Sequence, residues 1–250
     1  MRKGARRVAD VLPEIRAGLS AGTVQTASLV EWYVVDFAAL VGAVLPDLAA
    51  PAKDAIKAED GITKRMAQAG RLIHESYGLT AVDRLATGPS DTARGWAAYV
   101  IACEPALSMA DRLARVRPLA DDPHFGVREW AWLAVRNHIA GDVAGAIEVL
   151  RGWTDDGSAN IRRFAVECTR PRGVWCAHIP SLKAEPEPGR VLLEPLRADP
   201  SRYVQDSVAN WLNDASKTRP EWVAEICSRW LKESPTPTTD YIVRRGLRSS

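Results

Sequence analysis

Apolar positions along the chain recur mainly at intervals of three and four residues, whereas alternation of apolar and polar residues between hairpin turns is nearly absent. Such spacing is typical of helices that bury one face. It predicts an apolar helix over residues 30–48 closed by Pro46, an amphipathic helix over residues 62–77 that ends at Gly78, and a helix or helix pair over residues 92–109 broken near Pro105. We therefore predict an all-α protein.

Four segments of the second half share one pattern, in which a turn rich in Asp, Pro or Ser precedes an apolar helix. The equivalent apolar residues are Val127, Ile161, Val204 and Val243, which lie 34, 43 and 39 residues apart. That period fits two helices plus two turns, as in HEAT and armadillo arrays. Second helices are predicted over residues 142–153, 189–197 and 220–231. We predict an α-α superhelix, a C-shaped solenoid of HEAT-like repeats with one concave binding face.

We expect the solenoid to form a single domain over residues 1–250. The clearest repeats cover residues 121–250, and residues 1–60 are expected to form a helical N-terminal cap rather than a helix that binds a partner. A chain of 250 residues that is 46% hydrophobic is long enough to bury a core.

Charge and composition exclude some classes and leave others open. No apolar run approaches the roughly 18 residues of a membrane helix. Asp10, Glu14 and Arg16 interrupt any hydrophobic stretch behind the basic N-terminus, so no signal peptide is predicted. We therefore expect a cytoplasmic protein without membrane contact. A net charge of +2 neither requires nor forbids a polyanionic partner. Of the 33 basic residues 26 are Arg, which suits phosphate binding but also follows from a GC-rich genome.

The four cysteines carry no metal or disulfide pattern. Cys103, Cys168, Cys176 and Cys227 are widely spaced and form no C-x-x-C pair. We expect buried reduced thiols and no metal or cofactor.

Helical spacing assigns the polar residues of three repeats to outer faces. In the first repeat, one side of the helix carries Val127, Ala131, Ala134 and His138, and another carries Arg128, Trp132 and Arg136. The helix of the second repeat directs Arg163, Glu167 and Arg170 outward. The helix of the third repeat presents a polar stripe of Asp206, Asn210 and Asp214, with Asn213 beside it. These stripes fit a binding surface, but ordinary solvated faces with ion pairs such as Arg163 with Glu167 have the same pattern.

The tryptophans divide into two groups. One group has helical spacing and is expected in the core: Trp32, Trp96, Trp130, Trp153, Trp211, Trp222 and Trp230. Trp175 differs because Pro171 ends a helix and places the indole in a turn. An aromatic ring there is suited either to stacking on a base or sugar or to packing within the loop.

Two motifs resemble those of a known family. They are Arg162-Arg163-Phe164-Ala165-x-Glu167-x-Thr169-Arg170-Pro171-Arg172-x-x-Trp175 and Asp199-Pro200-Ser201-x-Tyr203-Val204-x-x-Ser207-Val208-Ala209-Asn210-x-Leu212-Asn213-Asp214-x-Ser216-Lys217. In this order they resemble the HEAT-like-repeat DNA alkylation repair glycosylases of the AlkC/AlkD superfamily, and more closely its AlkC branch. The resemblance covers about residues 121–248.

The resemblance implies a function in base excision repair of DNA. Family members lay a basic concave face on DNA and remove N3- or N7-alkylated purines such as 3-methyladenine by cutting the N-glycosidic bond. It implies Asp214 as the catalytic acid, Glu167 as a second carboxylate and Trp175 as the aromatic beside the lesion. The implied DNA contacts are Arg128, Arg163, Arg170, Arg172, Asn210, Lys217 and His124. We accordingly expect a monomer that needs no metal and acts on alkylated duplex DNA in the nucleoid.

Two features depart from the family pattern. His124 stands where the AlkC branch tends to carry an acid, and it is suited either to a phosphate contact or to capping the helix; Glu129 substitutes for the acid only if the helix presents it toward the groove. The sequence also lacks the immunoglobulin-like domain that some AlkC proteins append, so we expect weaker DNA affinity. A non-catalytic DNA-binding member of the superfamily and a protein-interaction solenoid therefore remain the alternatives.

Overall fold

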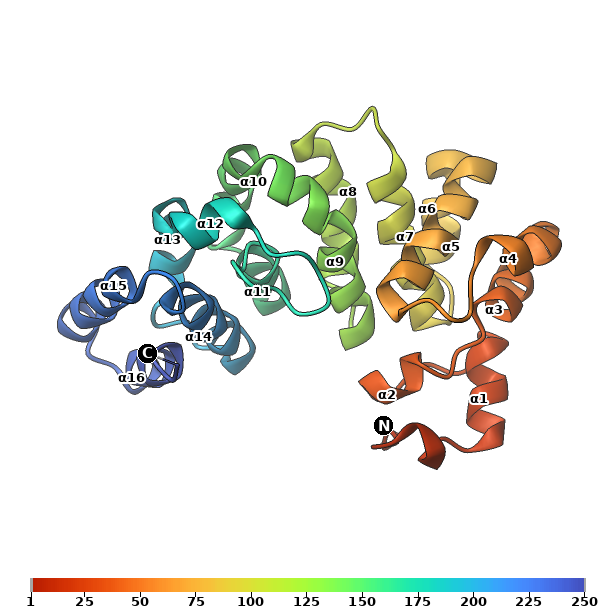
Figure 1. Cartoon of the computed structure of the whole chain (residues 1–250), viewed down its shortest axis with the longest axis horizontal. Helices are drawn as coiled ribbons and strands as arrows, with labels where there is room; N and C mark the ends of the chain where they lie inside the picture. The colour runs from red at the N-terminus through yellow and green to blue at the C-terminus, as the bar shows by residue number, and fades with distance from the viewer. Residues whose placement is uncertain (1, 250) are drawn as a thin grey trace. The chain divides into compact units, whose positions relative to one another are not determined.

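The computed structural model describes residues 2–249, and all regular elements in this range are helices (Figure 1). The α-helices are α1 (Pro13–Ser20), α2 (Leu29–Trp32), α3 (Phe37–Val44), α4 (Ala49–Ala55), α5 (Ile62–Tyr77), α6 (Ala81–Ala86), α7 (Asp91–Cys103), α8 (Met109–Ala120), α9 (Phe125–Gly141), α10 (Val143–Leu150), α11 (Ala159–Glu167), α12 (Pro180–Ala184), α13 (Arg190–Leu193), α14 (Arg202–Ser216), α15 (Pro220–Glu233) and α16 (Pro237–Gly246). The predicted all-α class is confirmed.

The helices form two compact units. The first comprises Met1–Leu107 and Pro118–Ala134, and the second comprises Ser108–Arg117 and Val135–Ser250. Helices α8 and α9 contribute residues to both units. Both motifs that carry the family resemblance, with Glu167, Trp175 and Asp214, belong to the second unit.

Several predicted helices have the expected bounds. Helix α5 spans Ile62–Tyr77 and ends at Gly78, whose φ of 55° is a conformation that glycine adopts at little cost. Helix α7 ends at Cys103 and α8 begins at Met109, so the predicted break near Pro105 is present.

The prediction of one helix over residues 30–48 is wrong. The stretch divides into α2, α3 and a 3₁₀ turn at Pro46–Leu48. Asp36 begins α3 because its side chain accepts a hydrogen bond from the Ala39 amide at 2.9 Å. An aspartate at such a helix start satisfies a backbone donor that no carbonyl of the helix reaches. Apolar spacing alone did not reveal this local signal.

The repeats share a contact between an arginine and the backbone of the turn before it. Arg94, Arg128 and Arg162 lie in the first turns of α7, α9 and α11. Each donates from Nη1 to two consecutive carbonyls of the preceding turn, at 2.7–3.2 Å. Gln205 of α14 donates to the Asp199 carbonyl in the same manner. This recurrence supports the predicted repeat in residues 121–250.

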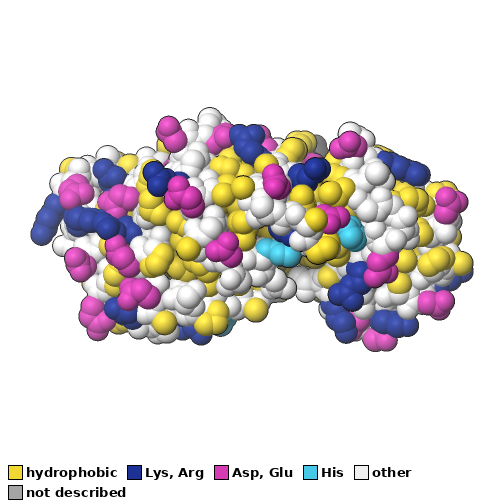
Figure 2. Space-filling model, turned by 90° about the horizontal axis from the view of Figure 1, so that it is seen from above, with side chains coloured by type: hydrophobic (Ala, Val, Ile, Leu, Met, Phe, Trp, Pro, Cys, Tyr) yellow, Lys and Arg dark blue, Asp and Glu magenta, His cyan; other side chains and the backbone are white. Residues whose placement is uncertain are grey.

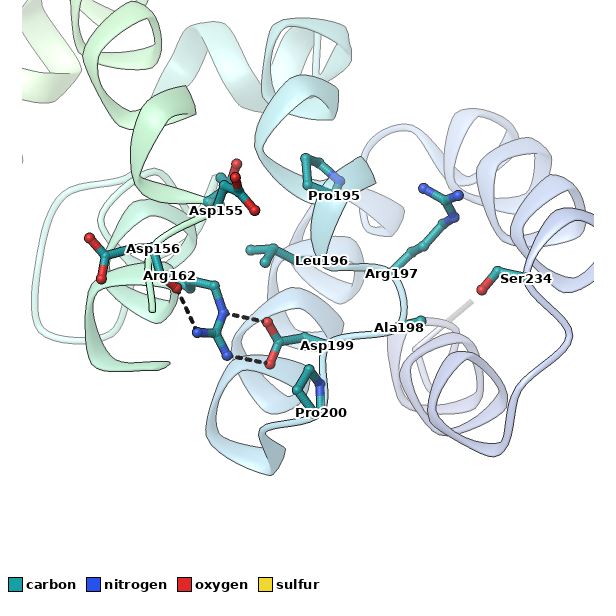
Figure 3. A pocket seen from close by; sticks show the side chains of 11 residues that line it. Asp155, Asp156, Arg162, Pro195, Leu196, Arg197, Ala198, Asp199, Pro200 and Ser234 are labelled. Atoms are coloured by element: carbon teal, nitrogen blue, oxygen red, sulfur yellow. Dashed lines mark hydrogen bonds and ion pairs between the residues drawn. The ribbon is translucent and has the colours of Figure 1, made fainter. Parts of the chain in front are cut away.

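Two of these arginines also join one turn to the next. Arg94 makes a two-bond contact with Asp122 at 2.8 and 3.2 Å, and Arg162 makes one with Asp199 at 2.6 and 3.0 Å. Figure 3 shows the second pair at the edge of a cleft of about 420 Å³. Among the described residues, those lining this cleft do not include Glu167 or Asp214, so it is separate from the candidate site.

Close packing of α5 on α7 depends on Gly70. A Cβ atom at this position would lie 2.3 Å from the Cβ of Tyr99 and 3.1 Å from its carbonyl carbon. We expect Gly70→Ala to destabilise the protein by about 1–3 kcal/mol, because the helices must separate to admit the methyl group. Urea unfolding would measure the loss. Gly141→Ala is the control, since nothing lies within 4 Å of its added Cβ. Equal stability of the two variants would contradict the prediction.

Candidate functional site

The candidate site forms where α11 packs against α14 (Figure 1). Helix α11 begins after Ser158, whose hydroxyl accepts from the Asn160 amide at 3.2 Å, and it ends at Glu167. Apolar residues of both helices, including Phe164 and Trp211, are buried. This packing brings Glu167 and Asp214, which are far apart in the sequence, to the same place.

Arg170 connects these two carboxylates. Its Nη1 donates to Oε1 of Glu167 at 2.7 Å, and its Nε donates to Oδ2 of Asp214 at 2.9 Å. The side chains of Arg170, Glu167 and Asp214 are only 10%, 6% and 5% exposed. Buried charges of this kind are tolerated because they are paired and hydrogen-bonded. The three groups therefore form a fixed chain of charges, acid to base to acid.

Both oxygens of Glu167 are occupied. Its Oε2 accepts from the Ser207 hydroxyl at 2.5 Å and lies 3.7 Å from Nη2 of Arg163, while Arg170 takes Oε1. Burial alone would raise the pKa of Glu167, but Arg163, Arg170 and the Ser207 hydrogen bond outweigh it and hold that pKa below its usual range. Glu167 is consequently ionised and saturated with partners.

Asp214 keeps one carboxylate oxygen less occupied. Arg170 holds Oδ2, whereas the charged neighbour of Oδ1 within the described chain is Nζ of Lys217, at 3.8 Å. Burial raises the pKa of Asp214, and the attraction of Arg170 and Lys217 offsets only part of that rise. Among the described residues, Oδ1 is thus the least occupied of the four carboxylate oxygens of Glu167 and Asp214.

A buried arginine supports the turn after α11. Arg136 is 1% exposed and donates to the carbonyls of Cys168 at 2.7 Å, Arg170 at 2.6 Å and Ala177 at 3.3 Å. Carbonyls at the end of a helix lack partners within the helix and carry partial negative charge, which suits a cation. Burial lowers the pKa of Arg136. Because it binds the Arg170 carbonyl, Arg136 helps to fix the residue that joins the two carboxylates.

Trp175 lies in the turn that follows. The turn is closed by a hydrogen bond from the Ile179 amide to the Pro171 carbonyl at 3.1 Å. The Trp175 ring is displayed on it, since the residue is 40% exposed, and its φ of 62° is rare for a bulky side chain. Arg172 ties the same turn to α14 by donating to the Asp214 carbonyl at 3.2 Å. The predicted position of Trp175 in a turn is confirmed, and its contact with a lesion stays a prediction.

The predicted outward direction of Arg163, Glu167 and Arg170 is wrong, since all three are buried. Trp132 and Arg136, assigned to an outer face of the first repeat, are buried too. For Arg163, Glu167 and Arg170 the cause is that complementary charged groups of α11, the turn after it and α14 cover each other, whereas Arg136 is buried against backbone carbonyls. Arg163 and Glu167 do form the ion pair that the spacing suggested, at 3.7 Å.

The polar stripe of α14 is largely covered by α16 and the residues after it. Tyr241 donates to Asp206 at 2.5 Å, and Arg248 donates to Asn210 at 2.9 Å. Asn213 and Asp214 are buried, whereas Asp206 and Asn210 are half-buried. The prediction that this stripe lies on an outer face is therefore wrong for Asp214 and only partly right for Asp206 and Asn210.

His124 and Arg128 belong to the first unit and make local contacts there. Nδ1 of His124 accepts from the Gly126 amide at 3.1 Å, and Nε2 lies 2.7 Å from the Thr26 carbonyl. His124 thus caps the start of α9, the second of the two roles considered for it. Glu129 accepts from the Trp132 indole at 2.7 Å. DNA contacts by His124 and Arg128 stay predictions.

Further findings concern the cysteines, metal-binding groups and helix lengths of the described residues. The four cysteines are free thiols; Cys168 and Cys227 are buried as expected, whereas Cys103 and Cys176 are only half-buried, and burial raises the pKa of Cys227 to about 12. Within residues 2–249 no group of three or more His, Cys, Asp or Glu side chains is arranged to hold a metal ion. Over the same range, no helix combines the length and the apolar character needed to cross a membrane. Among the tryptophans expected in the core, all are buried except the half-buried Trp222.

Comparison with sequences gives one partial match. No family model matches the chain. Over 116 residues it is 39% identical to the uncharacterized protein YhaZ of Bacillus subtilis, which covers 46% of this chain and 32% of YhaZ. The chain thus spans about a third of that relative.

Solved structures extend the similarity to nearly the whole chain. The alkylpurine DNA glycosylase AlkC of Pseudomonas fluorescens, bound to DNA containing an abasic site analog, matches with a TM-score of 0.69 and 27% identity over 96% of this chain and 65% of that one. AlkD2 of Streptococcus mutans shares the fold, with a TM-score of 0.66 and 20% identity over 82% of this chain and 98% of that one. With the repeats and the site described above, these similarities confirm the resemblance to AlkC/AlkD proteins and show that the chain has their HEAT-like helical-repeat fold.

Proposed function

We propose that the protein is a DNA glycosylase that removes cationic N3- or N7-alkylated bases, such as 3-methyladenine, from duplex DNA. The observation that carries this proposal is Asp214, a buried carboxylate with Oδ2 fixed by Arg170 and with Oδ1 3.8 Å from Nζ of Lys217, its charged neighbour among the described residues. The likeness to AlkC over 96% of the chain supports it. The protein acts as a monomer, without metal or cofactor, on DNA in the cytoplasm.

The chemistry fits a single carboxylate. An alkylated purine is cationic, so it departs with the electrons of the N-glycosidic bond as a neutral base and leaves positive charge on the deoxyribose. A fixed negative group near C1′ stabilises that charge in the transition state. Water then bonds to C1′ and releases a proton. Oδ1 of Asp214 is suited to stabilise the positive sugar and to accept the proton of the water, since Oδ2 is already bound to Arg170.

The neighbouring groups position this carboxylate. Glu167 has both oxygens occupied, so it acts by holding Arg170, which in turn orients Asp214. The burial of Arg163 and Arg170 favours the same positioning role over the phosphate contacts predicted for them. Arg172 and Lys217 are more exposed and are suited to phosphates. Trp175 offers an exposed ring to the lesion or its sugar.

Base release tests the proposal. The purified protein would be incubated with methylated duplex DNA in the presence of a chelator, and free methylated bases would be separated and measured by mass spectrometry. Release of 3-methyladenine above the rate without protein is the expected result. The second candidate, a DNA-binding protein without excision, is favoured by His124, which caps α9 where the AlkC branch tends to carry an acid. DNA binding without any release would support that candidate instead.

The pH dependence of base release should reveal Asp214. Activity needs the ionised carboxylate, whose pKa burial raises, so release is expected to fall in acid at a pH above the usual range of aspartate. Lys217→Ala removes an attraction that favours ionisation, so the acid limb should move to higher pH. Single-turnover release over a pH series measures this, with Lys232→Ala, an exposed lysine of α15, as the control. An unmoved acid limb in Lys217→Ala would contradict the assignment.

A further inference from the structure

One face of α14 carries a row of polar groups four residues apart, each of which holds a cation. We call Asp206, Asn210 and Asp214 the α14 row. Asp206 lies 3.6 Å from Nε of Arg245, and Asn210 accepts from Arg248 at 2.9 Å. Asp214, the third member, binds Arg170 and Lys217. The row therefore continues from the proposed catalytic carboxylate to the last residues of the chain that the structure describes.

The far end of the row has an excess of positive charge. Arg202 lies over the Tyr241 ring, with its guanidinium carbon 3.5 Å from the ring centroid, and Arg245 lies 5.5 Å from the same centroid. The Tyr241 hydroxyl donates a hydrogen bond to Asp206. Among the described residues, Asp206 is the carboxylate that pairs with this cluster, and its ion pair is with Arg245. Two guanidinium groups thus share the Tyr241 ring, and of these two Arg245 pairs with the Asp206 carboxylate.

Like charges held this close repel each other unless an anion is near. A tyrosine face attracts a cation but does not neutralise it. A third cation of the cluster, Arg248, is held by the neutral Asn210 and by the Arg245 carbonyl at 2.6 Å. Neither partner carries a full negative charge. Among the described residues, the three arginines of the cluster thus outnumber the carboxylate that pairs with them, and such an excess of positive charge favours binding of a polyanion.

These cations are accessible from solvent. Arg202, Arg245 and Arg248 are all exposed, and the Arg245 side chain is 45% exposed although it is paired. Figure 2 shows acidic, basic and hydrophobic side chains interspersed on one face of the molecule, in keeping with the net charge of +2. A local row is thus a more specific feature than the overall charge, since nucleic-acid binding depends on where cations gather.

We propose that Arg202, Arg245 and Arg248 bind consecutive phosphates of the DNA strand that carries the lesion, and that the α14 row positions them. This inference rests on the proposed function, because it takes Asp214 as the point where the lesion lies. Four residues advance an α-helix by about 6 Å, and a DNA strand has one phosphate per about 3.4 Å of duplex axis. Neighbouring positions of the row therefore match phosphates one or two nucleotides apart.

A substitution at Asp206 tests the proposal, because the two possible roles of the α14 row predict different changes in DNA affinity. As a carboxylate it repels phosphates, but as a hydrogen-bond acceptor it holds Tyr241. Asp206→Asn keeps an acceptor at this position and removes the charge. If the cluster binds DNA, this variant should bind DNA several-fold more tightly. If the row only attaches α16 to α14, the same change should weaken the attachment and leave DNA affinity unchanged or lower.

The experiment measures duplex affinity by fluorescence anisotropy over a series of salt concentrations, with unmodified DNA and with DNA containing an abasic site analog. The double variant Arg245→Ala/Arg248→Ala should bind both duplexes at least tenfold more weakly, and the slope of log K against log salt should decrease by about 2, close to 0.9 per lost phosphate contact. Arg202→Ala should decrease it by about 1. Arg190→Ala is the matched control, an exposed arginine of the same unit paired with Glu187 at 2.6 Å.

The outcomes separate this inference from the proposed function. Base release by the double variant at subsaturating DNA should fall in proportion to its loss of affinity, at least tenfold, whereas Arg190→Ala should release base like the unaltered protein. If the protein releases no base but the double variant loses affinity and salt dependence, the inference holds and the glycosylase proposal fails. If base release is normal and the double variant binds DNA like Arg190→Ala, the inference is overturned. Thermal unfolding of each variant controls for loss of α16 packing.

Discussion

Asp214→Asn is expected to lower the single-turnover rate of base release at least 100-fold while DNA affinity changes by no more than a few-fold. The amide has nearly the shape of the carboxylate, so Arg170 can still donate to it at the position of Oδ2. What is lost is the negative charge that stabilises the sugar in the transition state. Removal of one electrostatic contact of this kind costs about 10²–10³-fold in rate.

Two measurements make the Asp214 result specific. Asp206→Asn removes a carboxylate from the same face of α14 and should leave the rate at saturating DNA unchanged, since Asp206 faces Tyr241 and Arg245 instead of the site. Anisotropy on duplex DNA checks that the Asp214 variant still binds. A rate within tenfold of the unaltered protein would rule out Asp214 as the central carboxylate.

Glu167→Gln is expected to lower the free energy of unfolding by about 3–5 kcal/mol, the usual effect of removing one partner of a buried ion pair. Arg163 and Arg170 both use this carboxylate, and both are buried. Without it, Arg170 keeps Asp214 and Arg163 loses the acid that it faces in α11. Urea unfolding measures the change, with Glu225→Gln on the exposed side of α15 as the control.

The effect of Glu167 should depend on pH in a defined direction. Its pKa is held below the usual range in the folded protein, so its contribution to stability is present above the unfolded-state pKa and is lost as the pH falls through the folded-state pKa. The stability difference between the unaltered protein and Glu167→Gln should therefore shrink on acidification. A difference that grows in acid would mean that the carboxylate is not stabilised by the two arginines.

Local signals made much of the fold predictable. Gly78 ends α5 where the sequence places it, and the turns before α9, α11, α14 and α16 recur at the predicted repeat positions. Helix periodicity and turn chemistry are properties of a few neighbouring residues, so the sequence displays them directly. The prediction of one helix over residues 30–48 is wrong because it rested on hydrophobicity alone. It did not take account of Asp36, a local signal of a helix start.

The candidate site was only partly predictable. The motifs named Glu167, Trp175 and Asp214, but spacing assigned Glu167 and Arg170 to solvent, whereas α14 buries them. Which face of a helix is covered depends on partners distant in the sequence, and a charged face is covered when its partner face carries opposite charges. Arg136 was missed for the same reason, because its partners are backbone carbonyls some 30 to 40 residues later. Every residue has a backbone carbonyl, so the sequence does not show which carbonyl an arginine binds.

The arginines that bind the backbone of the turn before their helix have a consequence for how this chain can change during evolution. Arg94, Arg128 and Arg162 recognise main-chain oxygens, which every amino acid supplies. Mutations in those turns therefore leave these backbone contacts intact as long as the path of the backbone is kept, although a change at Asp122 would remove its side-chain contact with Arg94. Such contacts tolerate drift in turn sequence, and because each spans only five or six residues it does not depend on the spacing of the repeats, which varies from 34 to 43 residues.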